Sequence, residues 1–196
     1  MTPNELLFNE GTVKAGFLTR WFEESEGCPI EIDIGCNLGD FLLKRAQRYR
    51  SHRFLGVEYK YRLSFMAAEA MCKYDIDNVR LVNMEAFYFI SKCIPTSSIN
   101  GVHIYFPTPQ ERLLNQEFER QAYRILKHQC FLRFATDPAN DIYFDEVTNL
   151  FASKHWLRVP WTFMDIGQPE GYLVGTPAEI QFSAPNKTLG AEFRKK

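Results

Sequence analysis

Short apolar runs of strand length alternate along the chain with segments whose apolar residues recur at helical spacing. Five such runs are predicted to form buried strands: residues 30–34, 54–57, 79–82, 102–106 and 131–135. Helical stripes follow most of them: residues 41–49, 63–74, 114–125 and 142–152. Strands that alternate with helices of this length predict a parallel sheet that is covered by helices on both faces.

The pattern changes after Trp156. Glycine and proline punctuate the sequence from Pro160 through Gly167 to Pro185, and no long helical stripe is present there. Two late strands are expected in this tail, paired antiparallel at the edge of the sheet. The sequence therefore predicts an α/β fold with a mostly parallel sheet and an antiparallel edge strand, in one domain over residues 1–196.

Composition and charge narrow the class of protein. The formal net charge is −1, so a broad nucleic-acid-binding surface is not predicted. The stretch from Lys44 to Arg62 is locally basic, although an ordinary solvated helix face explains it more simply. The five cysteines are scattered and the four histidines complete no metal-ligand cluster, which predicts reduced thiols in a cytoplasmic protein without a metal. Neither a signal peptide nor an apolar run of about 20 residues is visible.

The first predicted strand ends in a glycine-containing loop, DIGCNLG, over Asp33–Gly39. Glycines allow a tight turn and a close approach of the backbone to a ligand, and open α/β sheets bind ligands at this end of their strands. Glu58 closes the second strand, nineteen residues after Gly39, where a carboxylate can accept both hydrogens of a ribose diol. Loop and acid together indicate a cofactor that contains adenosine. The alternative is a pair of glycines that merely turn the chain.

The loop favours one adenosine cofactor over another. The last glycine of the GxGxxG pattern is missing, because Phe41 and Leu42 follow Asp40. The pyrophosphate of NAD, which that pattern accommodates, fits this loop poorly. The methionine moiety of S-adenosylmethionine needs no phosphate nest and fits better.

An ordered set of motifs between residues 31 and 179 resembles the tRNA (guanine-N7)-methyltransferase family. The motifs are the acidic glycine loop Asp33–Gly39, the strand FLGVE ending at Glu58, the segment NVRL with Glu85 and Ala86, the FPTP loop with Thr108, the ATD motif ending at Asp137, and Thr176 with Glu179. The resemblance implies a Rossmann-like class I S-adenosylmethionine-dependent methyltransferase. It also implies transfer of the methyl group to a ring nitrogen of a guanine-like base, with tRNA as the partner.

The same resemblance implies roles for individual residues. The residues implied to bind the cofactor are Asp33, Gly35, Cys36, Asn37, Gly39, Glu58, Tyr59, Glu85, Ala86 and Thr108. The residues implied to bind the substrate are Arg112, Asp137, Thr176 and Glu179, with Asp137 as the catalytic residue. Two of these residues also have a simpler interpretation: Asp137 can be a helix cap, and Glu179 can be a solvated strand residue.

The chain departs from the family mainly in the substrate half. The family's middle glycine is Asn37 here, its FPDP aspartate is Thr108, and the tryptophan that follows is Gln110. Arg112 alone keeps a positive charge in a run that is basic in the family. These departures question the tRNA substrate more than they question methyl transfer.

Methylation of guanine N7 does not require the missing aspartate as a base, because N7 has a lone pair in the ring plane and no proton. Positioning can meet much of the barrier, and carboxylates such as Asp137 and Glu179 would stabilise the positive charge that the ring gains. Three functions stay open: methylation of tRNA, methylation of a small nitrogen heterocycle by an enzyme of the same lineage, and a non-catalytic binding module. The oligomeric state is not predicted.

Overall fold

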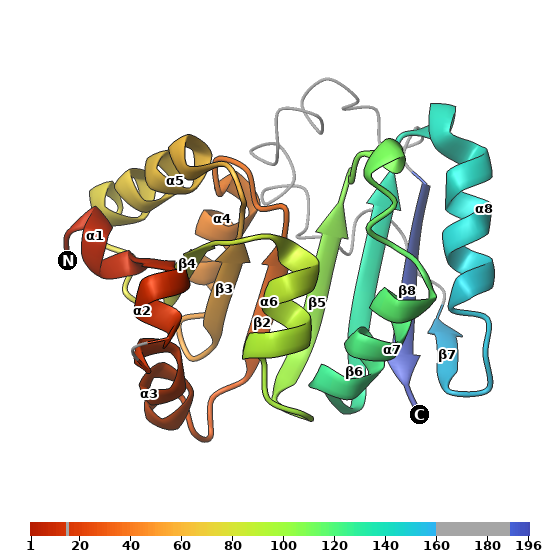
Figure 1. Ribbon diagram of the computed structural model, residues 1–196, viewed down its shortest axis with the longest axis horizontal. Coiled ribbons are helices and arrows are strands. Elements are labelled where there is room, and N and C mark those ends of the chain that lie inside the picture. Colours follow the sequence, from red (N-terminus) through yellow and green to blue (C-terminus); the bar gives the residue numbers. More distant parts are fainter. Residues whose placement is uncertain (15, 160–188) are drawn as a thin grey trace. The chain divides into compact units, whose positions relative to one another are not determined.

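The computed structural model describes residues 1–14, 16–159 and 189–196. The chain forms two compact units, residues 1–93 and residues 94–196, which Figure 1 colours from red to blue along the sequence. The first unit is built on parallel strands and the second on a mixed set of parallel and antiparallel strands, with helices packed against each. The prediction of one domain over residues 1–196 stays a prediction.

The described residues of the first unit form four strands in the order β1-β4-β3-β2, and each neighbouring pair is parallel. Their bounds are Leu7–Asn9 for β1, Ile30–Ile34 for β2, Arg53–Val57 for β3 and Val79–Asn83 for β4. Ile34 lies opposite Val57 and Val57 lies opposite Val82, so β2, β3 and β4 end at one edge. The three predicted strands of this unit are confirmed, whereas β1 was not predicted.

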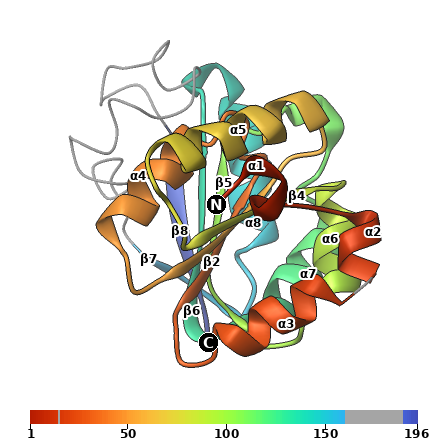
Figure 2. The same ribbon diagram turned by 90° about the vertical axis from the view of Figure 1, so that its left-hand side faces the viewer.

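The described residues of the first unit, 1–14 and 16–93, form six helices. They are α1 (Pro3–Leu6), α2 (Glu10–Lys14), α3 (Phe17–Glu24), α4 (Asp40–Arg48), α5 (Tyr61–Lys73) and α6 (Ala86–Cys93). The stripes over residues 41–49 and 63–74 correspond to α4 and α5, and both helices are confirmed. Figure 2 shows α4 and α5 on one side of the strands and α2 and α6 on the other.

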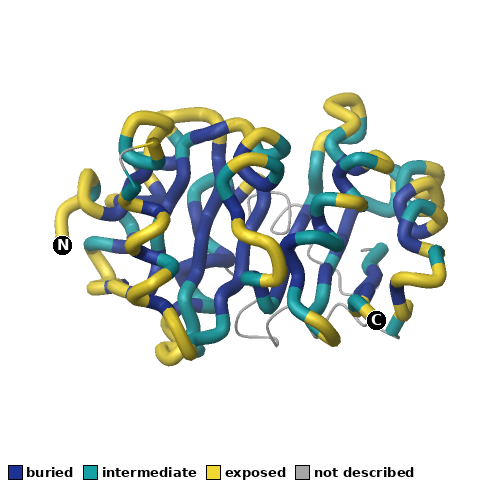
Figure 3. The backbone as a smooth tube through the Cα atoms, turned by 60° about the horizontal axis from the view of Figure 1, so that its bottom comes forward, coloured by how far each residue is buried: buried dark blue, intermediate teal, exposed yellow. Residues whose placement is uncertain are grey.

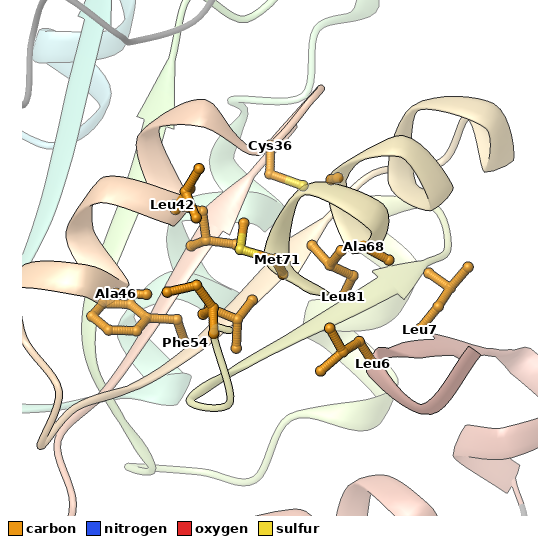
Figure 4. Close-up of a cluster of buried hydrophobic side chains, with 13 residues drawn as sticks. Leu6, Leu7, Cys36, Leu42, Ala46, Phe54, Ala68, Met71 and Leu81 are labelled. Atoms are coloured by element: carbon orange, nitrogen blue, oxygen red, sulfur yellow. The ribbon is translucent and has the colours of Figure 1, made fainter. Parts of the chain in front are cut away.

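The core of the first unit lies between β3, β4 and the helices α4 and α5. Figure 4 shows its buried side chains, among them Leu42 from α4, Met71 from α5 and Leu81 from β4. Leu6 of α1 is fully buried against them, so the short first helix closes one end of this core. Truncating a buried leucine of this kind to alanine typically costs about 2–5 kcal/mol of stability.

In its described part, residues 94–159 and 189–196, the second unit contains four strands in the order β5-β6-β8-β7. Their bounds are Ile99–Tyr105 for β5, Leu126–Thr136 for β6, Trp156–Val159 for β7 and Leu189–Lys195 for β8. β5 and β6 are parallel, whereas β8 is antiparallel to both β6 and β7. The predicted antiparallel pair of late strands is therefore confirmed, and β8 is inserted between β6 and β7.

The described residues of the second unit also form two α-helices and two short 3₁₀ helices. They are α7 (Gln116–Ile125), α8 (Asp141–Leu150), η1 (Pro109–Glu111) and η2 (Pro138–Asn140). Asn115 caps α7, because its side-chain oxygen accepts the N–H groups of Glu117 and Phe118 at 3.0 Å each. In Figure 3 the strands of each unit are buried, and the exposed positions gather in loops and on outer helix surfaces.

Candidate active site

The loop after β2 turns over the end of β3. The backbone N–H groups of Gly35 and Cys36 both donate to the carbonyl oxygen of Val57, at 2.8 and 3.1 Å. Gly35, Asn37 and Gly39 have φ angles of 76°, 51° and 78°. Asparagine tolerates this left-handed region better than most residues, so Asn37 can replace a glycine without changing the path of the loop.

The two glycines of the loop serve different purposes. A Cβ at Gly39 would lie 3.0 Å from the Cβ of Ala67 and 3.1 Å from the Cε of Met71, so Gly39 lets the start of α4 pack against α5. A Cβ at Gly35 would meet no atom of the described residues within 4 Å. These residues therefore leave the Gly35 backbone accessible to a ligand that approaches the loop.

Two buried carboxylates lie beside this loop. Asp33 on β2 is 4% exposed and Glu58, directly after β3, is 6% exposed. Asp33 pairs with Gly56, and Glu58 lies two residues further along, so strand alternation places both carboxylates on the same face. Burial, followed by the negative charges of Asp33 and Glu58, raises the pKa of the Cys36 thiol well above its usual value. Cys36 is therefore a protonated core residue of the loop and not a nucleophile.

Glu58 is held by the backbone and by one amide side chain. Its Oε1 accepts the backbone N–H of Lys60 at 2.9 Å. The Asn83 Nδ2 donates to the carbonyl oxygens of Glu58 and Tyr59, at 3.0 and 2.9 Å, which fixes the chain after β3. The Tyr59 side chain is exposed. Asn83 was not among the predicted site residues, and a polar residue at the end of the third strand was the signal that could have identified it.

Glu85 and Ala86 mark the start of α6. The two carboxylate oxygens of Glu85 accept the backbone N–H groups of Phe87 and Tyr88, at 2.8 and 2.6 Å. A carboxylate at this position satisfies the free N–H groups of the first turn and opposes the positive end of the helix dipole. The structure therefore gives Glu85 a helix-capping contact, at the same strand edge as Glu58.

Asp40 is an acid at the same strand edge that the sequence analysis did not assign to the site. It is the first residue of α4 and follows Gly39 directly. Burial raises the pKa of this carboxyl, and Lys44 opposes the shift. Asp40 thus adds a partly buried carboxyl to the edge that carries the glycine loop.

The second unit places the remaining described candidates at the carboxyl ends of β5 and β6. The backbone N–H of Phe106 donates to the carbonyl oxygen of Ala135 at 2.8 Å, which joins the loop after β5 to the end of β6. Thr108 precedes η1 and is exposed, and Arg112 follows it with a φ of 47° and is also exposed.

Asp137 has the capping contact that the simpler interpretation expected. Its Oδ1 accepts the backbone N–H of Ala139 at 2.8 Å, at the start of η2. The side chain is half-buried. A cap uses one of the two carboxylate oxygens, so the contact does not by itself exclude a second role. Thr176 and Glu179, the other predicted substrate residues, lie outside the described residues.

The fold and the glycine loop after β2 together define the class of protein to which the chain belongs. A mixed sheet with helices on its faces, a glycine loop after β2 and a buried acid after β3 form a Rossmann-like methyltransferase fold. The solved structure of a SAM-dependent methyltransferase from Aquifex aeolicus superposes with a TM-score of 0.63 at 12% identity, over 96% of this chain and all of that one. This likeness confirms the predicted fold class.

The family follows from the sequence. Residues 28–160 match the family described as "Putative methyltransferase", and the chain belongs to this family. The chain is 28% identical over 137 residues to a tRNA (guanine-N(7)-)-methyltransferase of Thermotoga maritima. This match covers 66% of the chain and 43% of the Thermotoga enzyme. It is 29% identical over 123 residues to the enzyme of that name from Geobacter metallireducens, and this match covers 59% of the chain and 54% of the Geobacter enzyme. The chain thus spans about half the length of the curated relatives that it matches.

Proposed function

We propose that the protein is an S-adenosylmethionine-dependent methyltransferase that methylates a ring nitrogen of a guanine-like base in tRNA. The observation that carries the proposal is the position of Glu58, which is buried, is fixed by the Lys60 N–H and directly follows Val57, the residue to which the glycine loop donates. The curated relatives are named for methylation of guanine N7 in tRNA. Their names support the substrate class, and the geometry supports the cofactor class.

The residues of the first unit fit the cofactor. Glu58 would accept the ribose hydroxyls, because Lys60 binds Oε1 and the carboxylate has further acceptor sites. Asp33 and Asp40 give this edge a negative character that suits a sulfonium and an α-amino group. Exposed Tyr59 offers a ring face for the adenine. When bound, S-adenosylmethionine supplies a methyl group on a sulfonium.

The residues of the second unit are assigned to the substrate. Asp137 would orient the N–H donors of a guanine-like ring and stabilise the positive charge that the ring gains. Arg112 would contact a phosphate, and Thr176 with Glu179 would complete the recognition. Exposed Thr108 replaces the family aspartate, which is compatible with transfer to an unprotonated nitrogen because no proton has to be removed.

A second candidate is methylation of a small nitrogen heterocycle by the same machinery. Arg112 is the single cation between residues 110 and 115, and Glu111 lies beside it. This loop therefore offers little positive charge for an RNA backbone. The net charge of −1 over the whole sequence also favours a small substrate over tRNA.

Turnover with labelled S-adenosylmethionine tests both candidates. Bulk unmodified tRNA and a panel of free purines and related heterocycles serve as acceptors, and mass spectrometry locates the methyl group. Activity on tRNA should fall steeply as salt rises, because phosphate contacts release counterions. Activity on a small heterocycle should be nearly independent of salt. A methyl group on oxygen, on carbon or on a protein side chain would reject both.

We also propose a cytoplasmic location. All five cysteines are free thiols, which persist in a reducing compartment. Among the described residues, no helix is both long enough and apolar enough to cross a bilayer.

A further inference from the structure

A cavity of about 370 Å³ lies in the second unit, where the end of α8 meets β7 and β8. It lies at the opposite end of β8 from the candidate substrate residue Asp137. Leu189 at one end of β8 pairs with Thr136, and Lys195 at the other end pairs with Trp156, so the two ends are roughly 20 Å apart at 3.4 Å per residue. In Figure 1 the elements that form the cavity meet near the chain end marked C.

Three buried aromatic rings form the floor of this cavity. Phe151 stacks on Phe193 with ring centroids 4.9 Å apart and meets Trp156 edge-on at 5.1 Å. The indole N–H of Trp156 donates to a carboxylate oxygen of Glu119. Each of the three rings is at most 3% exposed. The floor is therefore rigid, and the side chains at its rim are held in defined places.

The rim carries three basic side chains, and the described residues that line it contribute no acidic side chain. The polar residues that line the cavity are Thr148, Asn149, Ser153, Lys154, Arg158 and Lys196, and no aspartate or glutamate is among the described lining residues. Arg158 reaches the cavity from β7, where it pairs with Phe193 of the floor. Lys196 is positioned by its backbone N–H, which donates to the carbonyl oxygen of His155 at 3.0 Å.

Neighbouring basic residues are already used inside the fold. The Lys195 Nζ donates to the carbonyl oxygens of Tyr123 and Leu126 at 2.8 Å each, and Arg194 pairs with Glu192 at 2.8 Å. Within residues 1–14, 16–159 and 189–196, no ion pair forms on the side chains of Lys154, Arg158 or Lys196.

Like charges around one cavity repel each other, and the aromatic floor offers them no counter-charge. The free carbonyl groups at the end of α8 favour one nearby cation, which accounts for Lys154. They do not account for Arg158 on β7 or for Lys196 after β8. An anion in the cavity would relieve the repulsion of all three.

We propose that this cavity binds the phosphate group of a nucleotide, either free or within a strand. Lysine and arginine donors together with hydroxyl and amide groups are the donors that proteins use for phosphate. The volume lies at the lower end of the range for small-molecule sites, which leaves room for more than inorganic phosphate. The proposal does not depend on methyl transfer.

Isothermal titration calorimetry on the full chain tests the site with uridine 5′-monophosphate, uridine and a twelve-residue oligouridylate. Uridine compounds are chosen because they lack the adenine of the expected cofactor. The monophosphate should bind and uridine should not. The double variant Lys154→Ala/Arg158→Ala should weaken binding by about tenfold or more, because it removes two charge-assisted contacts. Arg158→Lys should retain most of the affinity.

Arg120→Gln is the matched control. It removes one positive charge from the same unit, from a side chain that is 71% exposed and pairs with Glu117, and it should leave binding unchanged. If the oligouridylate binds more tightly than the monophosphate and with a steep salt dependence, the ligand is a strand. If both bind alike, it is a free nucleotide. Equal binding of uridine and its monophosphate, or an unaffected double variant with an unchanged unfolding midpoint, would overturn the proposal.

Discussion

Gly56 lies directly against Cys36: a Cβ at position 56 would lie 2.9 Å from the Cys36 Sγ. The same Cβ would lie 2.7 Å from the Cδ2 atoms of both Leu42 and Leu81. The missing side chain in the middle of β3 thus lets the glycine loop after β2 and α4 pack closely onto the strand. Strand packing and loop position are set by the same contact.

Gly56→Ala should therefore destabilise the protein by about 1–3 kcal/mol, as overpacking of a dense core does. Urea unfolding measures the change. When Gly56→Ala is combined with Leu42→Ala, the two losses of stability should be less than additive, because the second substitution removes one of the clashing methyl groups. Additive effects of the two substitutions would show that the clash is not the cause.

Glu58→Ala should weaken the binding of S-adenosylhomocysteine by about 1.5–3 kcal/mol, the range for hydrogen bonds to a charged group. Calorimetry gives the affinity directly. Glu69→Ala is the control, since Glu69 is an exposed acid on α5 and its loss should not affect binding. Equal affinities of the Glu58 variant and the parent would contradict the assigned role.

Asp137→Asn separates the capping contact from the charge. The asparagine oxygen can still accept the N–H of Ala139, so stability should change by less than about 0.5 kcal/mol. Turnover should fall by about 10²-fold if the charge stabilises the methylated ring, the scale for loss of one such electrostatic contact. Asp137→Ala should lose turnover and about 1 kcal/mol of stability together. An asparagine variant with full activity would reduce Asp137 to a cap.

Arg45→Met should be strongly destabilising. The Arg45 side chain is 9% exposed and binds Glu31, whose side chain is 3% exposed and also lies 3.0 Å from the Nδ1 of His52. Removing one partner of a buried pair leaves an uncompensated charge and typically costs about 3–5 kcal/mol. Denaturant unfolding should show this loss, whereas Arg48→Met on the exposed side of α4 should change stability by less than about 0.5 kcal/mol. Equal losses in the two variants would refute the explanation.

Tyr143→Phe should stabilise the protein. The Tyr143 hydroxyl is buried without a hydrogen-bond partner among the described residues, and removing an unsatisfied group of this kind gains about 1 kcal/mol.

The same substitution should also change how the stability of the protein depends on pH. Burial, with a smaller contribution from Glu146, raises the pKa of Tyr143 to about 12. The unfolded chain loses this proton from about pH 10, while the folded chain retains it, so stability falls as pH rises from 10 toward 12. Urea titrations at pH 8, 10 and 11 should show a smaller fall for the variant than for the parent. If the stability of the variant and of the parent fell equally with pH, the raised pKa of Tyr143 would not be the cause.

The predictable parts of the fold were those with long periodic patterns. The strand at residues 30–34 and the helix from Leu63 to Tyr74 have enough apolar positions at regular spacing to be predicted from the sequence. β1 has three residues and is defined by its pairing with β4, more than seventy positions away, so local patterning cannot reveal it. The glycine loop and Glu58 could be proposed as a cofactor site from the sequence because that chemistry requires particular residue types after particular strands. The contacts of Asn83 and Glu85 depend on how loops fold over strand ends, which single-residue patterns do not encode.

The insertion of β8 between β6 and β7 has a consequence for synthesis on the ribosome. β6 can pair with β5 as soon as both have emerged, but its other edge waits for residues 189–194. At 5–20 residues per second, the delay is on the order of 3–10 s. During that time the apolar edge from Phe131 to Ala135 is open to pairing with another nascent chain. Chaperones that shield exposed strand edges should therefore influence the yield of this protein more than its final stability would suggest.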